Sequence, residues 1–392
     1  MADMVRLGVD RLFDEYGHRL EGRRVGLITN PSGVDSSLVS TIDRLDAYDG
    51  VELARLFAPE HGIRGDRQAG ETVPDEVDER TGVPVRSLYG DTRRIQPEMI
   101  DDLDAVIYDM QDVGCRFYTL VYTLANAMEG CGGTDTEFVV LDRPNPIAPV
   151  GVSGNRVPDD RASFVSGRRL PIVHGLTIGE LARYFDGEFD LGVDCTVVEM
   201  TGWSPDRWFD ELDLPWIPPS PNVPTPETAL VYPGTCLFEG TTFSEGRGTT
   251  KPFELIGAPG IDAHEWASAL DEIGLEGVGF RPVSFEPTTS KHEGEIVSGL
   301  QLHVLDRDRF APVETGIAML LSAVRLFSDL EWIRMDGTYF LDRLAGGPWL
   351  RRAIDDHDRS RRLSKLFREL IDRWTDDVES FERCRERYAR YR

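Results

Sequence analysis

The sequence has almost no lysine. Only Lys251, Lys291 and Lys365 occur among 43 basic residues, so arginine supplies the other 40. Acidic residues number 69, and the formal net charge of the 392-residue chain is −26 at pH 7. Because nucleic acids and anionic membranes bind proteins through basic patches, we expect neither as a partner. Salt screens the mutual repulsion of surface carboxylates, so the composition favours a halophilic protein over an acidic protein from a GC-rich genome.

Cysteine is scarce as well, and long apolar runs are absent. The five cysteines are scattered, and no two have the Cys-x-x-Cys spacing, which excludes a disulfide framework and a thiolate zinc site. No stretch approaches the roughly 20 apolar residues of a membrane span. The N-terminal segment, residues 1–17, lacks the apolar core of a signal peptide. These absences predict a soluble, cytoplasmic protein.

The sequence also lacks the glycine-rich loops that hold nucleotides. We find no Gly-x-Gly-x-x-Gly after the first apolar strand, no P-loop Gly-Lys-Ser/Thr and no Gly-x-Ser-x-Gly nucleophile elbow. Glu60, His61, Asp109 and Asp112 are possible metal ligands, but His174 lies in a separate loop. We therefore expect no metal site and no cofactor.

Short β-forming apolar runs alternate with helical patterns through the first 200 residues. This alternation predicts a parallel sheet covered by helices on both faces, a Rossmann-like α/β layer. The predicted strands are residues 24–29, 52–57, 83–89, 104–110, 137–142 and 195–200, and the predicted helices are 36–48, 117–130 and 177–189.

Residues 203–233 interrupt this rhythm with eight prolines, and neither a long helix nor a central strand is expected there. Beyond them we expect helices at 262–274, 313–327 and 360–374, and strands at 277–286 and 296–306. The fold class is therefore α/β, with a Rossmann-like catalytic domain at residues 1–228. A smaller α+β domain at residues 229–392 is expected to complete a cleft between the two.

Polar side chains follow four of the predicted strands. Ligands of open α/β sheets bind at the carboxyl ends of the strands, so this pattern predicts a functional cleft along one rim. The residues are Asn30 after the first strand, Glu60 and His61 after the second, Asp109, Gln111 and Asp112 after a third, and Asp142, Arg143 and Asn145 after a fourth.

Two further segments, 219–222 and 237–254, are polar and lie near the domain junction. They contain Asn222, Glu239, Glu245 and Arg247. Domain junctions often hold clefts, but a stiff linker followed by a solvated turn with a local ion pair explains the same residues. Both interpretations stay open on the sequence pattern alone.

Several carboxylates with Tyr, Asn and Arg, but without a metal set or nucleotide loop, favour glycoside hydrolysis. That chemistry needs one protonated carboxyl group at the leaving oxygen and a second group that stabilises or attacks the anomeric carbon. Glu60 follows an apolar strand, where partial desolvation would raise its pKa and suit it as the acid.

Seven segments together resemble the NamZ-type exo-β-N-acetylmuramidases. They occur in the family's order between about residues 24 and 306, and read FAPEHGIRGD, YDMQDVGCRFYT, VLDRPNP, HGLTIGELA, PSPNVPT, YPGTCLFEGTTFSEGRGT and KPFELIGAP. The resemblance implies a Rossmann-like domain, a smaller C-terminal domain and release of N-acetylmuramic acid from non-reducing ends of peptidoglycan fragments. It also implies that Glu60 is the catalytic glutamate.

We expect Glu60 to be the general acid, with Asp109, Asp112 or Glu245 as its acidic partner, unless the substrate's 2-acetamido group is the nucleophile. Arg64, Arg143 and Arg247 are candidates for the lactyl carboxylate, because a guanidinium binds a carboxylate through two parallel hydrogen bonds. The other expected substrate-binding residues are Asn30, His61, Gln111, Tyr118, Asp142, Asn145, Asn222 and Glu239.

The expected partner is a small saccharide or muropeptide, and the sequence predicts no oligomeric state. Two alternatives to the muramidase hypothesis stay open. One is a β-N-acetylhexosaminidase-like enzyme whose sugar lacks the lactyl group, and the other is a non-catalytic sugar- or nucleotide-binding module.

Overall fold

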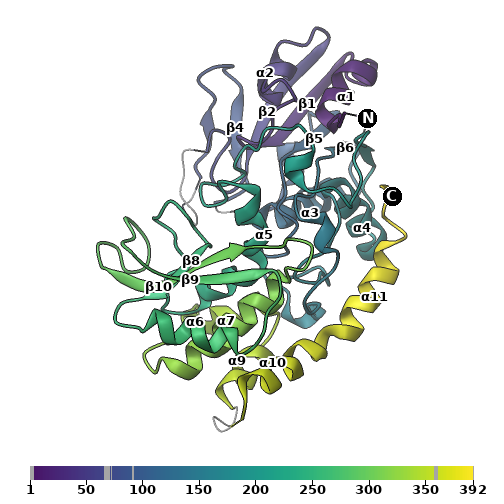
Figure 1. Cartoon of the computed structure of the whole chain (residues 1–392). Coiled ribbons are helices and arrows are strands. Elements are labelled where there is room, and N and C mark those ends of the chain that lie inside the picture. Colours follow the sequence, from purple (N-terminus) through teal and green to yellow (C-terminus); the bar gives the residue numbers. More distant parts are fainter. Residues whose placement is uncertain (1–3, 66–70, 72, 91, 357–360, 392) are drawn as a thin grey trace.

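A mostly parallel seven-stranded sheet forms the N-terminal part of the protein (Figure 1). The computed structural model describes residues 4–65, 71, 73–90, 92–356 and 361–391. The strand order is β3-β4-β2-β1-β5-β6-β7, and only the β3–β4 pair is antiparallel. The bounds are β1 Arg23–Thr29, β2 Val51–Ala58, β3 Glu76–Val77, β4 Pro84–Ser87, β5 Ala105–Asp109, β6 Glu137–Leu141 and β7 Cys195–Val198. The predicted Rossmann-like α/β layer is confirmed.

The central strands β5 and β6 are mostly apolar and are buried along their whole length, because both faces of the sheet are covered. Along β5, Val106 and Tyr108 enter one core while Ala105 and Ile107 enter the other. Helices α3 (Thr119–Cys131) and α4 (Ile178–Phe189) cover the first face. Helices α1 (Gly8–Glu15) and α2 (Thr41–Asp46) cover the opposite face.

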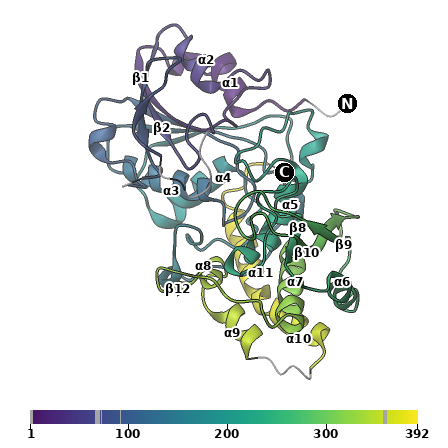
Figure 2. The same ribbon diagram turned by 90° about the vertical axis from the view of Figure 1, so that its left-hand side faces the viewer.

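A three-stranded antiparallel sheet forms the centre of the C-terminal part, in the order β8-β10-β9 (Figure 2). Helices α6 and α7 pack against one another, and α6 contacts β9 and β10. The bounds are β8 Leu255–Ala258, β9 Val278–Phe285, β10 Val297–Val304, β11 Arg334–Met335 and β12 Thr338–Tyr339, with α5 Pro226–Thr235, α6 Ala263–Asp271, α7 Pro312–Leu326, α8 Phe340–Leu344, α9 Trp349–Asp355, α10 Leu363–Ile371 and α11 Thr375–Arg385.

The proline-rich segment differs from the expectation at its end, where it forms the ten-residue helix α5. Pro226 occupies the first turn of α5, where a missing N–H costs nothing, and Pro233 lies near the last turn. Gly234 of α5 meets Gly316 of α7, and a Cβ at Gly316 would lie 2.2 Å from the Gly234 carbonyl oxygen. The two helices can approach this closely only because both positions lack side chains.

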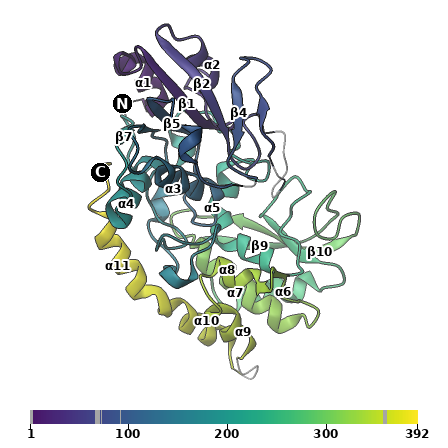
Figure 3. The ribbon, with the colours of Figure 1, turned by 180° about the vertical axis from the view of Figure 1, so that it is seen from behind.

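The C-terminal helices return to the N-terminal sheet. Figures 1 and 3 show α10 and α11 running from the far end of the molecule back to α4. Tyr391 attaches the end of the chain to the N-terminal part. Its hydroxyl donates to Asp142 Oδ2 at 2.5 Å and accepts from the Met200 N–H at 2.9 Å. No helix among the described residues is both long enough and apolar enough to cross a membrane.

Candidate active site

A cavity of about 480 Å³ opens beyond the carboxyl end of β2, between the large sheet and the C-terminal part. Residues from both parts line it, so the predicted cleft between them is confirmed. The lining includes Glu60, His61, Tyr89, Arg93, Phe117, Tyr118, Thr119, Phe164, Ser220, Asn222, Tyr232, Glu239, Glu245, Arg247, Phe253, Met335, Phe340 and Arg343.

Glu60 lies in the turn that follows β2 and is 7% exposed. The next residue, His61, has a φ of 74°, a value that is uncommon outside glycine, and Gly62 shares it. This tight turn reverses the chain as soon as the strand ends, which places Glu60 at the cavity rather than in the sheet. Strained backbone of this kind persists where the surrounding structure holds it, and it is enriched at active sites.

Two hydroxyl groups orient the Glu60 carboxylate. Thr119 Oγ1, at the start of α3, donates to Glu60 Oε2 at 2.6 Å. The Tyr89 hydroxyl also hydrogen-bonds Glu60, and burial together with the nearby Glu60 charge raises the pKa of Tyr89 to about 12. Tyr89 therefore stays protonated at neutral pH and can only donate to the carboxylate, which fixes the direction in which Glu60 presents its other lone pairs.

Two further carboxylates, Glu239 and Glu245, enter the cavity from the segment after α5. The Arg247 guanidinium donates to Glu239 Oε1 at 2.6 Å and lies 3.3 Å from Glu245 Oε1. Burial acts to lower the pKa of Arg247, but the charges of Glu239 and Glu245 outweigh it and raise that pKa. The cation therefore remains charged at any working pH and holds both carboxylates in place.

Lys291, in the loop between β9 and β10, holds the other oxygen of Glu245. Its Nζ lies 2.8 Å from Glu245 Oε2 and also donates to the carbonyl oxygens of Phe238, at 2.9 Å, and Phe243, at 3.0 Å. An ammonium can serve oxygens that surround it, whereas a planar guanidinium cannot. That geometry accounts for a lysine in a chain that otherwise uses arginine, and this rarity was the one sequence signal that could have identified Lys291.

The cavity gathers seven of the residues that the sequence singled out: Glu60, His61, Tyr118, Asn222, Glu239, Glu245 and Arg247. The sequence did not single out Tyr89, Arg93, Thr119, Phe164 or Lys291. No motif marks the first four, because each reaches the cleft only through the way its element packs.

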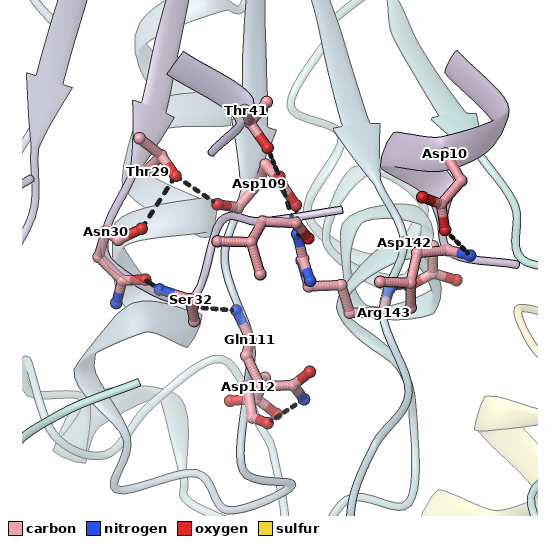
Figure 4. A network of polar contacts seen from close by, with 12 residues as sticks. Asp10, Thr29, Asn30, Ser32, Thr41, Asp109, Gln111, Asp112, Asp142 and Arg143 are labelled. Atoms are coloured by element: carbon pink, nitrogen blue, oxygen red, sulfur yellow. Dashed lines mark hydrogen bonds and ion pairs between the residues drawn. The ribbon is translucent and has the colours of Figure 1, made fainter. Parts of the chain in front are cut away.

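The residues at the ends of β1 and β5 lie outside the cavity lining and form a separate buried network (Figure 4). Arg143 Nε donates to Asp109 Oδ1 at 2.6 Å, and the Thr41 hydroxyl donates to Asp109 Oδ2 at 2.5 Å. The Ser32 hydroxyl accepts from the Gln111 N–H at 2.9 Å and donates to Asn30 Oδ1 at 2.5 Å. These partners already satisfy the polar groups of the network.

The proline-rich segment covers this network. Asn30 Nδ2 donates to the Pro219 carbonyl at 2.9 Å, and Leu214, Pro215 and Trp216 close over Gln111 and Arg143. The remaining space there is only about 20 Å³. In the strand order, β1 is the point at which successive strands change side, and this is where open α/β sheets usually bind ligands. The chain itself fills that crevice, and the cavity lies instead beyond β2.

The other predicted site residues make local contacts outside the cavity lining. Arg64 forms a bidentate pair with Asp78 at 2.8 and 3.0 Å. Asp112 Oδ2 accepts from the Gly114 N–H at 2.8 Å and lies 3.4 Å from His174 Nε2. Asn145 Nδ2 donates to the Leu176 carbonyl at 2.9 Å. All of these contacts lie within the N-terminal part.

Asp142 follows β6, and its carboxyl group contacts the N-terminal end of α4. There Oδ1 accepts from the Gly179 N–H at 2.8 Å and Oδ2 accepts from the Thr177 hydroxyl at 2.9 Å. Burial raises the pKa of Asp142 to about 7, and the Tyr391 hydrogen bond only partly opposes this effect. An unfolded chain would have a value of about 3.9. Between these two values only the folded state keeps the proton, so Asp142 makes stability fall as pH rises from about 4 to about 7.

An Asp142→Asn substitution removes this titration. We therefore expect the melting temperature of the variant minus that of wild type to increase from pH 5 to pH 8, because only the wild type loses this contribution as the pH rises. Thermal unfolding at constant salt measures it, with the exposed Asp135→Asn as the control whose offset stays constant. A pH-independent offset for Asp142→Asn would contradict the assignment.

Among the described residues, no group of three or more His, Cys, Asp or Glu side chains is arranged to hold a metal ion. The cavity instead presents carboxylates, guanidinium groups and aromatic rings. Carboxylates and arginines recognise a polar, partly charged ligand, and aromatic rings pack against the apolar face of a sugar.

Comparisons with known proteins agree with this arrangement. Sequence models for the N- and C-terminal parts of "Exo-beta-N-acetylmuramidase NamZ" match residues 25–227 and 230–391. The chain is 45% identical to peptidoglycan beta-N-acetylmuramidase NamZ of Bacillus subtilis (strain 168) over 388 residues, which are 99% of this chain and 91% of that protein.

Two crystal structures of DUF1343 family proteins from Bacteroides fragilis NCTC 9343 are also similar. One has a TM-score of 0.90 and 36% sequence identity, covering 99% of each chain. The other has a TM-score of 0.77 and 28% identity, covering 100% of this chain and 99% of that one.

Proposed function

The chain belongs to the NamZ family of exo-β-N-acetylmuramidases, and we propose that it releases N-acetylmuramic acid from the non-reducing ends of peptidoglycan fragments as an exo-acting glycoside hydrolase. The observation that carries the proposal is the pairing of Glu60 with a second carboxylate group across one cavity. Glycoside hydrolysis requires two such groups with different roles.

Glu60 is the proposed general acid. It is buried, and Thr119 and Tyr89 hold its carboxyl group toward the cavity. In the proposed step, the Glu60 carboxyl proton moves to the glycosidic oxygen while the bond from that oxygen to the anomeric carbon breaks. The electron pair of that bond leaves with the oxygen, so positive charge develops on the sugar ring.

Glu245 is the proposed partner of Glu60. It lines the cavity, whereas Asp109 and Asp112 do not. Two cations, Arg247 and Lys291, bind its two oxygens, which holds the Glu245 side chain in the cavity, where it can stabilise positive charge on the sugar. The same anion can polarise the 2-acetamido group of the substrate, if that group attacks the anomeric carbon.

The experiment is hydrolysis of para-nitrophenyl β-N-acetylmuramide and of the matching N-acetylglucosaminide, in about 2–3 M KCl to screen the acidic surface. We expect the wild-type chain to cleave the muramide and to prefer it. Preference for the glucosaminide would favour a β-N-acetylhexosaminidase, and binding without cleavage of either would favour a non-catalytic module.

Three other properties belong to the same proposal. The division into domains at residues 228 and 229 is supported by the separate sheets on either side of α5. Adaptation to salt is supported by the net charge of −26, and the third property is a cytoplasmic location. Stability that rises with KCl concentration would test the adaptation to salt.

A further inference from the structure

Arg93 lies in the cavity beside the proposed acid and differs from the other arginines there. Its guanidinium carbon is 4.0 Å from the centre of the Phe164 ring and 5.1 Å from that of Tyr89. Tyr89 in turn hydrogen-bonds Glu60, so one aromatic ring separates Arg93 from the acid. The side chain is exposed to solvent at the cavity, where a ligand can reach it.

The other lining arginines already have carboxylate partners. Arg247 pairs with Glu239 and Glu245. Arg343, in α8, pairs with Asp336 at 3.2 Å and donates to the Met335 carbonyl at 2.7 Å, both in the β11–β12 hairpin. In the part of the chain that the structure describes, no carboxylate lies within ion-pair distance of Arg93.

The three arginines that the sequence predicted to bind the lactyl carboxylate also have carboxylate partners in the protein. Arg64 is paired with Asp78, Arg143 with Asp109, and Arg247 with two glutamates. A substrate carboxylate at any of them would have to displace a carboxylate of the protein. Among the described residues that line this cavity, Arg93 is therefore the arginine without an acidic partner.

We propose that Arg93 binds the lactyl carboxylate of the sugar and thereby selects muramic over glucosamine residues. This inference rests on the proposed function. The two rings hold the guanidinium by cation–π contacts without consuming its hydrogen-bond donors. The planar guanidinium of Arg93 is held in place with its donors available, so it can donate two parallel hydrogen bonds to a substrate carboxylate. The lactyl group is on C3 of the sugar, two ring carbons from C1, so the group that binds it must lie close to the acid without contacting it, as Arg93 does beside Tyr89.

The test compares two para-nitrophenyl glycosides, β-N-acetylmuramide and its lactyl methyl ester, which have nearly the same shape but differ in charge. We expect wild type to prefer the acid, and Arg93→Gln to reduce kcat/KM for the acid by roughly 10- to 100-fold while leaving the ester nearly unchanged. Arg93→Lys should keep part of the preference. Arg94→Gln is the matched control, since Arg94 is a neighbouring exposed arginine that pairs with Glu129.

Binding of free N-acetylmuramic acid and of its methyl ester, measured by calorimetry, separates this inference from the hydrolase proposal. Absence of turnover with a preserved, Arg93-dependent preference for the acid would overturn the hydrolase proposal alone. Equal binding of acid and ester by wild type would overturn the role of Arg93. An equal loss for both ligands in Arg93→Gln would also overturn it, because a structural role would affect both.

Discussion

Glu60→Gln is expected to reduce hydrolysis of para-nitrophenyl β-N-acetylmuramide by about 10²- to 10⁴-fold, the usual contribution of a general acid. Glutamine keeps the size of the side chain and can still accept from Thr119 Oγ1. It has no carboxyl proton to give to the leaving oxygen. The loss should therefore appear in kcat, with KM and the melting temperature close to those of wild type.

Leaving-group dependence sharpens this test. A para-nitrophenolate leaves with less protonic assistance than a sugar leaving group does. Glu60→Gln should therefore lose more activity on a disaccharide than on the chromogenic substrate. The control is Glu272→Gln, which neutralises an exposed glutamate at the end of α6. A loss below tenfold for Glu60→Gln, or an equal loss for both leaving groups, would contradict its role as the acid.

Arg116→Met is expected to lower the free energy of unfolding by about 3 kcal/mol or more, since each buried carbonyl left unpaired costs about 1–3 kcal/mol. Arg116 is fully buried and donates to the carbonyl oxygens of Leu170, at 3.2 Å, and of Leu344, at 2.7 Å, and to that of Asn155. Burial lowers the pKa of Arg116 to about 10, so the side chain is still charged at neutral pH. Methionine fills similar volume but donates to none of these carbonyls.

The same substitution should affect the cleft, because Arg116 directly precedes Phe117, Tyr118 and Thr119 in the lining. Urea unfolding at constant salt measures the stability. Arg161→Met, at an exposed arginine, is the control and is expected to change stability by less than about 0.5 kcal/mol. Arg116→Lys keeps the positive charge, so its loss of stability should lie between those of Arg116→Met and Arg161→Met. A loss below about 1 kcal/mol for Arg116→Met would show that the carbonyls find other partners.

Much of the N-terminal sheet could be predicted because burial on both faces leaves continuous apolar strands, and the six predicted strands coincide with β1, β2, β4, β5, β6 and β7. Helix α5 was not expected, since proline content hid the fact that Pro226 stands in a first turn. The packing of α5 could not be predicted from local sequence, because Gly234 meets Gly316 of a helix about 80 residues further along the chain.

The candidate site could be predicted only in part, and Glu60 and Asp109 show why. Each lies at the carboxyl end of a largely apolar strand of the same sheet, so the local sequence does not distinguish them. They differ because residues 214–219 lie over the end of β5 and leave the end of β2 open. The docking of a distant segment decides which carboxylate meets the cavity. The same applies to Arg93, whose position depends on Phe164.

The two carboxylate groups of the cleft come from distant parts of the chain, and this has a consequence for biosynthesis. A ribosome makes Glu60 long before Glu245, and N-terminal segments fold first during synthesis. The large sheet can therefore form with its acid in place while the opposite wall of the cleft does not yet exist. Lys291, which holds Glu245, is made later still. The nascent protein is thus expected to be inactive until the segment that carries Glu245 and Lys291 has been made and has packed against the large sheet.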